Sequence, residues 1–161
     1  MTKEETEKNF NIERKKHFEF YLPFYQEKNW IVVNDNIDGN KPISWDVEIE
    51  VFAGQFKKVD EKVLTHEWNN CLIEIIQDME TGSLGWFFGE KDWVLYGSWN
   101  DLEEIYPSSL YLISMNRLKP HIYGLKKMIP TVVSHKGWGI TWNLRLDWVD
   151  LTEKEIIQKL I

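Results

Sequence analysis

Two carboxylates in this sequence stand where strands could present them for chemistry. Glu74 lies within residues 72–76, the most apolar run of the chain. A lone carboxylate in such surroundings is costly unless it is paired, protonated or bound to a cation. Asp46 lies near the start of the alternating segment of residues 45–52 and faces away from Trp45 and Val47. Carboxylates on neighbouring strands can hold Mg²⁺ or Mn²⁺, which prefer oxygen ligands, and such a cation can activate water for attack on a phosphodiester.

Both carboxylates also have a purely structural interpretation. Glu74 could form an ion pair or hydrogen bond that fixes a sheet, and Asp46 could accept hydrogen bonds from backbone amides where a strand begins. The residue types alone leave both interpretations open.

Other chemistries find less support in the sequence. The four histidines show no metal-ligand spacing. Glycine-rich phosphate loops and the nucleophile elbow of hydrolases are both absent from the sequence. The single cysteine, Cys71, lies in an apolar run, where we expect an unreactive thiol.

The surrounding segments predict the elements that position these residues. Residues 2–25 carry apolar side chains at helical spacing, and Pro23 should end or bend that helix. Residues 53–70 are polar and could form an extended hairpin arm. Residues 116–125 could form a short helix, and Thr152 with Glu155 resembles the capping box of a last helix. Seven segments have the composition of strands: residues 29–33, 45–52, 71–79, 93–99, 110–115, 131–134 and 139–148.

This order predicts one α/β (α+β) domain over residues 1–161, with a central mixed sheet flanked by helices. A single cysteine allows no disulfide within the chain, which favours a reducing compartment. The polar N-terminus and the shortness of the apolar runs predict a cytoplasmic protein without a membrane segment.

Charge is distributed unevenly along the chain. The net charge is −7, yet residues 105–146 contain six basic residues and no Asp or Glu. Such an asymmetry indicates a candidate surface for nucleic-acid phosphates, unless these charges scatter over different faces. The candidate phosphate-binding residues are Arg117, Lys119, Lys126, Lys127 and Lys136.

The order of a helix, a strand, a strand with Asp46 and an apolar strand with Glu74 resembles the PD-(D/E)xK nuclease superfamily. Residues 85–96 also resemble small phage and bacterial members, in which a loop leads into the next strand. The similarity spans roughly residues 10–151, and it implies a restriction endonuclease-like fold.

The resemblance also implies roles for individual residues. Asp46 and Glu74 would bind Mg²⁺ or Mn²⁺ together with a backbone carbonyl, and Glu19 on the first helix would be an additional acidic ligand. The superfamily's lysine, two residues after the glutamate, is replaced here by Ile76. Gln77, if a bulge turned it to the same face, or Lys91 from the loop could substitute for it.

Three hypotheses about function follow. The first is a metal-dependent nuclease that cuts DNA or RNA. The second is a catalytically inactive relative that binds nucleic acid or a protein, as Ile76 suggests. The third is an acidic phage-encoded inhibitor that mimics DNA. Many relatives of the fold dimerise, so a homodimer is a further candidate, although no segment specifies an interface.

The glycine-rich aromatic loop of residues 81–89 has two interpretations. Its aromatic residues could stack on unpaired bases, or they could fill the edge of a sheet as core residues, which we favour because aromatic side chains so often serve the core.

Overall fold

The computed structural model describes residues 3–65, 70–126, 130–135 and 139–161. The helical elements there are α1 (Lys3–Lys16), the π-helix η1 (His17–Tyr21), α2 (Leu22–Glu27), the 3-10 helix η2 (Trp86–Phe88), α3 (Met115–Tyr123) and α4 (Trp148–Glu153). The strands are β1 (Ile31–Asp35), β2 (Val47–Phe52), β3 (Gln55–Leu64), β4 (Asn70–Asp78), β5 (Ser83–Leu84), β6 (Trp93–Ser98), β7 (Ser109–Ser114), β8 (Pro130–His135), β9 (Gly139–Asp147) and β10 (Ile157–Lys159).

These strands form two sheets. The larger sheet has the order β1-β2-β3-β6-β7-β10, and the smaller sheet has the order β5-β4-β9-β8. Within the described residues only β3 and β6 pair in parallel. The predicted α+β class with a mixed sheet in one compact domain is therefore confirmed, and a second, smaller sheet accompanies the mixed one.

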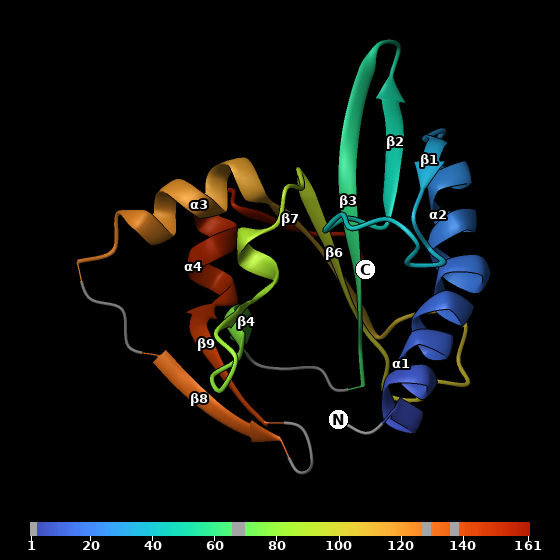
Figure 1. Ribbon diagram of the computed structural model, residues 1–161. Coiled ribbons are helices and arrows are strands. Elements are labelled where there is room, and N and C mark those ends of the chain that lie inside the picture. The colour runs from blue at the N-terminus through green and yellow to red at the C-terminus, as the bar shows by residue number, and fades with distance from the viewer. Residues whose placement is uncertain (1–2, 66–69, 127–129, 136–138) are drawn as a thin grey trace.

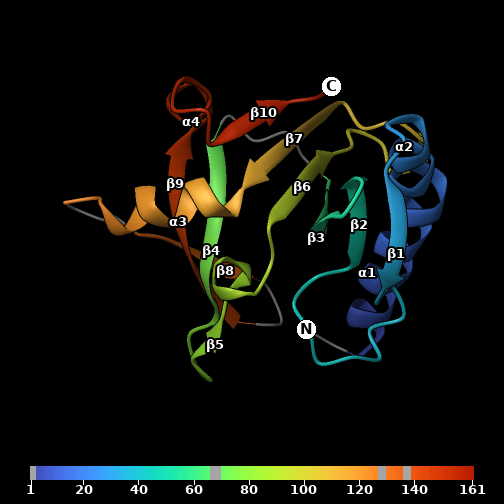
Figure 2. The same ribbon diagram turned by 90° about the horizontal axis from the view of Figure 1, so that it is seen from above.

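The larger sheet lies between the N-terminal helices and the smaller sheet (Figures 1 and 2). On the helix side, aromatic residues of η1 and α2 pack against alternate residues of β2 and β3, including Val47, Ile49 and Val59. On the other side, Ile73 of β4 and Phe87 of η2 lie in a second core cluster. Because strand side chains alternate between faces, the central strands β6 and β7 supply residues to both cores.

The long N-terminal helix is present, but it extends further than the sequence predicts. It continues through Pro23 to Glu27, directly after a π-turn in which the Leu22 N–H donates to the carbonyl of His17, five residues earlier; such a turn shifts the backbone hydrogen bonds next to the position where proline has no N–H to donate. Its middle turn, His17–Tyr21, is a π-helix.

The C-terminal segment differs from the predicted helix. Asp147, rather than Thr152, caps α4, since its Oδ1 accepts hydrogen bonds from the backbone N–H groups of Val149 and Asp150. Thr152 instead donates its hydroxyl to the carbonyl of Trp148 inside the last turn. The helix ends at Glu153, and the chain then adds β10 to the sheet edge beside β7.

No helix among the described residues is both long enough and apolar enough to cross a membrane.

Candidate functional site

Asp60 and Lys62 on β3 form the centre of the candidate site. They are two residues apart, so their side chains share one face of the strand, which faces the smaller sheet. Lys62 Nζ lies 3.1 Å from Asp60 Oδ1, and Lys91 Nζ pairs with Asp60 Oδ2. The Asp60 and Lys91 side chains are 7% and 2% exposed, whereas the Lys62 side chain is 30% exposed. One buried aspartate therefore joins a buried lysine and a partly exposed one.

The parallel pairing of β3 with β6 positions Lys91. Val94 of β6 lies opposite Asp60, so the residues that lead into β6 run past the same part of β3. There Lys58 and Asp92 clamp the two segments. The Asp92 N–H donates to the Lys58 carbonyl at 2.8 Å, and the Lys58 N–H donates to Asp92 Oδ2 at 2.8 Å. This clamp holds Lys91 against Asp60.

Asp46 reaches the same part of β3 from the residue before β2. Its N–H donates to the Val59 carbonyl at 2.9 Å, and its Oδ2 accepts a hydrogen bond from the Glu61 N–H at 2.6 Å. The structural role that the sequence left open for Asp46 is thus present. Burial raises the pKa of Asp46 well above its usual value, and the nearby charges of Asp60 and Glu61 raise it further.

Glu61 points to the opposite face of β3, toward the N-terminal helices. Its carboxylate lies 2.9 Å from His17 Nδ1 and accepts a hydrogen bond from the Tyr25 hydroxyl at 2.7 Å. All three side chains are buried, so this network fixes the π-helical turn and α2 to the strand that carries Asp60.

The two lysines beside Asp60 differ electrostatically. Burial would raise the pKa of Asp60, but Lys62 and Lys91 together outweigh it and lower that pKa. Burial would lower the pKa of Lys62, yet Asp60 and Asp46 raise it above the usual value. For Lys91 burial dominates and lowers the pKa, although Asp60 opposes it. Lys62 therefore holds its proton more tightly than an ordinary lysine, and Lys91 holds its proton less tightly.

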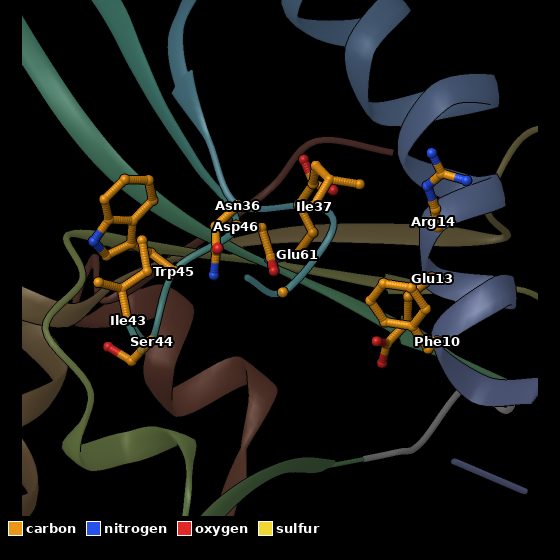
Figure 3. Close-up of a pocket in the computed structure, with 11 residues that line it drawn as sticks. Phe10, Glu13, Arg14, Asn36, Ile37, Ile43, Ser44, Trp45, Asp46 and Glu61 are labelled. Atoms are coloured by element: carbon orange, nitrogen blue, oxygen red, sulfur yellow. The ribbon is translucent and has the colours of Figure 1, made fainter. Parts of the chain in front are cut away.

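A first pocket, of about 220 Å³, opens beside Asp46 on the side of the N-terminal helix. Figure 3 shows Asp46 and Glu61 in its middle, between Trp45 on one side and Glu13 of α1 on the other. Partial burial raises the pKa of Glu13; Lys62 opposes the shift, and Asp60 and Glu61 add to it. Glu13 is thus the third acidic side chain of this pocket, after Asp46 and Glu61.

A second pocket, the intersheet pocket, has a volume of about 490 Å³ and lies between β3 and β4. Its lining residues are Ser44, Asp60, Lys62, Glu74, Gln77, Leu84, Gly85, Trp86, Phe88, Gly89 and Lys91. Three of the residues that the sequence predicted for catalysis, Glu74, Gln77 and Lys91, therefore meet in one pocket with Asp60 and Lys62.

A β-bulge brings Glu74 and Gln77 together. Glu74 pairs with Asn143 and Ile76 pairs with the next residue, Trp142, so Ile75 is an extra residue in β4. An inserted residue reverses the alternation of side chains beyond it, and Gln77 consequently lines the same pocket as Glu74. Burial raises the pKa of Glu74, although Lys62 and the Trp86 N–H oppose the shift.

The other predicted ligands lie elsewhere. Asp46 lines the first pocket rather than the intersheet pocket. Glu19 lies near Lys15 and Lys16, at 3.9 and 3.7 Å, and lines neither pocket. Among the described residues no three His, Cys, Asp or Glu side chains are arranged to hold a metal ion.

Three of the predicted basic residues lie on α3 or just after it: Arg117, Lys119 and Lys126. Arg117 pairs with Glu155 at 3.1 Å, and Lys119 donates to the carbonyl of Gly89 at 3.4 Å, beside the intersheet pocket. Lys126 is exposed. The predicted residues Lys127 and Lys136 lie outside the described residues.

Sequence reasoning missed Asp60, Lys62 and Glu13. Asp60 and Lys62 lie in residues 53–70, whose polar composition suggested only a hairpin arm. The available signal was the pairing of an acidic residue with a lysine two positions later, flanked by Val59 and Val63. That spacing places both side chains on one face of a strand.

Comparisons with protein-family models, with curated proteins and with solved structures gave no match to this chain.

Proposed function

We propose that this protein is a metal-dependent nuclease that hydrolyses phosphodiesters of DNA or RNA at Asp46, Asp60 and Lys62. The observation that carries the proposal is the position of Asp46, the residue before β2, beside the part of β3 that carries Asp60 and Lys62, where the charge of Asp60 acts on Asp46. The spacing of Asp60 and Lys62 also fits the (D/E)xK part of the superfamily pattern better than Glu74 and Ile76 do.

Carboxylate oxygens are the donors that a hard divalent cation prefers, and Asp46 and Asp60 would supply them. The raised pKa of Asp46 reflects burial and repulsion by Asp60 and Glu61, and a bound cation would offset that repulsion. Both oxygens of Asp60 are engaged by lysines, so a cation would have to displace one. Lys62 is the lysine that can move, because its side chain is 30% exposed whereas that of Lys91 is 2% exposed.

The cation, Lys62 and Lys91 would have different roles in hydrolysis of the phosphodiester. When bound, Mg²⁺ or Mn²⁺ supplies activation of water and stabilises charge on the phosphodiester. Lys62, displaced from Asp60, would place its Nζ against a phosphate oxygen and stabilise the developing negative charge. Lys91 Nζ, with a lowered pKa, would accept or return a proton near the reacting atoms.

One observation favours a second candidate, an inactive relative that binds nucleic acid or a protein. The lysines neutralise Asp60 without a metal ion, as in an ion-pair network whose role is to hold the fold together.

The test is Mn²⁺ titration by calorimetry, with cleavage assays on plasmid and single-stranded substrates in the same buffer. We expect the wild type to bind Mn²⁺ and to cleave, and we expect Asp46→Asn to lose both. Glu19→Gln is the matched control, because Glu19 lies outside both pockets, and it should retain both. Glu74→Gln separates the two candidate ligand sets and should retain Mn²⁺ binding.

A wild type that binds no Mn²⁺ would overturn the nuclease proposal and favour the inactive relative. Loss of Mn²⁺ binding in Glu74→Gln but not in Asp46→Asn would move the metal site to the second sheet.

A further inference from the structure

We propose that the intersheet pocket binds an unpaired nucleobase of the substrate, so that the protein acts on single-stranded or locally opened nucleic acid. This inference rests on the proposed nuclease function and names the substrate class of that site. It depends on three features of the pocket: an aromatic wall, a polar edge and neighbouring cations.

The wall is the 3-10 turn η2, whose consecutive aromatic residues have different roles. Phe87 is 1% exposed and belongs to the core between the sheets, whereas Phe88 is 42% exposed and lines the pocket together with Trp86. The turn is anchored as well as aromatic. The Gly85 N–H donates to the Ile75 carbonyl at 2.8 Å. A buried anchor with an exposed ring beside it provides a fixed face on which a base can stack, and such stacking tolerates any base.

The turn lies directly on β4. A Cβ atom added at Gly85 would lie 2.2 Å from the carbonyl oxygen of Glu74, closer than atoms can pack. Glycine therefore allows the aromatic wall to stand against the strand that carries the polar edge of the pocket.

Glu74 and Gln77 form that polar edge, since the bulge at Ile75 turns both toward the pocket. A carboxylate accepts hydrogen bonds from the amino groups of bases, and an amide both donates and accepts. A base stacked on the aromatic wall would therefore meet groups that match its Watson–Crick edge. In a duplex that edge is already paired and the base faces are covered, so only an unpaired or flipped base can enter.

Cations lie where the attached phosphates would run. Lys62 lines the same pocket, and Lys119 contacts the carbonyl of Gly89 at its rim. The volume of about 490 Å³ lies in the range of small-molecule pockets, roughly 300–1,000 Å³. The base would thus occupy the pocket while its phosphate lies next to Asp60 and Lys62.

The test measures binding by fluorescence anisotropy with a labelled single-stranded dodecamer in Ca²⁺. The comparison strands are the same dodecamer with abasic sites at its four central positions and the matching duplex, and the series is run with DNA and with RNA. We expect the wild type to bind the base-containing strand at least about fivefold more tightly than the abasic strand, as expected for loss of stacked bases.

Phe88→Ala should remove this preference, and Gln77→Ala should weaken it. Phe56→Ala is the matched control, because Phe56 on the β2–β3 hairpin is 49% exposed and lies outside the pocket. It should bind all strands as the wild type does. Circular dichroism and urea unfolding of each variant confirm that it is folded.

Equal binding of base-containing and abasic strands by the wild type, in both DNA and RNA, would overturn the inference. So would equal effects of Phe88→Ala and Phe56→Ala, or no binding of any strand. Plasmid nicking in Mn²⁺ separates the two proposals. If the protein nicks plasmid but binds base-containing and abasic strands equally, only the base pocket is refuted. If it cleaves no substrate, the nuclease function is refuted.

Discussion

Replacing Asp60 with asparagine tests the energetics of the candidate site directly. Asp60→Asn preserves the size of the side chain and one hydrogen-bond acceptor, but it removes the charge between Lys62 and Lys91. Lys62 can turn to solvent because its side chain is 30% exposed, whereas Lys91 is 2% exposed and cannot. The variant therefore leaves one buried ammonium group without its anion.

The expected cost is about 3 kcal/mol at pH 7, the lower end of what is measured when one partner of a buried ion pair is removed. The lower end applies because asparagine still accepts a hydrogen bond and Lys62 is solvated. Against a typical stability of about 5–15 kcal/mol, the variant should fold with a clearly lowered midpoint.

The deficit should shrink as the pH rises. Burial already lowers the pKa of Lys91, and Asp60 opposes that shift, so loss of Asp60 lowers the pKa further. A lysine with a lowered folded pKa binds fewer protons when folded than when unfolded, so folding becomes more favourable as pH rises toward its unfolded pKa of about 10.4. The difference from wild type should therefore be largest near neutral pH and smaller at pH 9–10.

The assay is urea unfolding followed by tryptophan fluorescence in EDTA, at pH 7 and pH 9.5, within a double-mutant cycle with Lys91→Met. The methionine removes the unpaired ammonium group, so the double variant should recover about 2 kcal/mol of the loss. Two results would refute a buried ion pair at this position. One is a double variant whose loss of stability equals the sum of the two single losses, and the other is an Asp60→Asn variant within about 0.5 kcal/mol of wild type.

Three further substitutions have expected outcomes. In EDTA at pH 7, Asp46→Asn should raise the free energy of unfolding by about 1 kcal/mol, because it removes a buried charge repelled by its neighbours. Its raised pKa means that folding loses stability as pH rises through that pKa, so the gain should shrink at pH 5; a loss of stability at pH 7 would contradict this. Gly85→Ala should lower the free energy of unfolding by about 2 kcal/mol, since the added Cβ meets the Glu74 carbonyl; an unchanged urea midpoint would show that the turn can move away. Tyr25→Phe should cost about 1–2 kcal/mol in the same assay, because the buried Glu61 carboxylate loses a hydrogen bond; no change would imply that water replaces the hydroxyl.

Much of the local structure could be predicted from the sequence because it depends on nearest neighbours. The period of apolar residues determined the long N-terminal helix, and the β-branched and alternating runs determined most strands, including β2 and β4. Pro23 did not end the helix, because the π-turn before it shifts the backbone hydrogen bonds next to the position where proline lacks an N–H. The capping residue of α4 was misassigned because Asp147 and Thr152 are both competent caps, and the choice depends on where β9 ends and β10 begins.

The candidate site could be predicted only in part. Glu74, Gln77 and Lys91 were identified individually, yet their meeting in one pocket depends on the bulge at Ile75 and on the pairing of β6 with β3. Asp60 and Lys62 were overlooked because a charged strand does not show the apolar pattern of a buried one. The burial of Asp60 is offset by Lys62 and by Lys91, which is distant in sequence.

The sequence by itself determines which side chains share a face of a strand, because that depends only on the two-residue period of the backbone. The tertiary structure decides which faces meet. It places Asp60 and Lys62 opposite β4, Glu61 against the N-terminal helices, and Asp46 beside β3. These placements come from long-range strand pairing. The pKa and the chemistry of an ionisable side chain depend on the neighbours that such pairing brings to it.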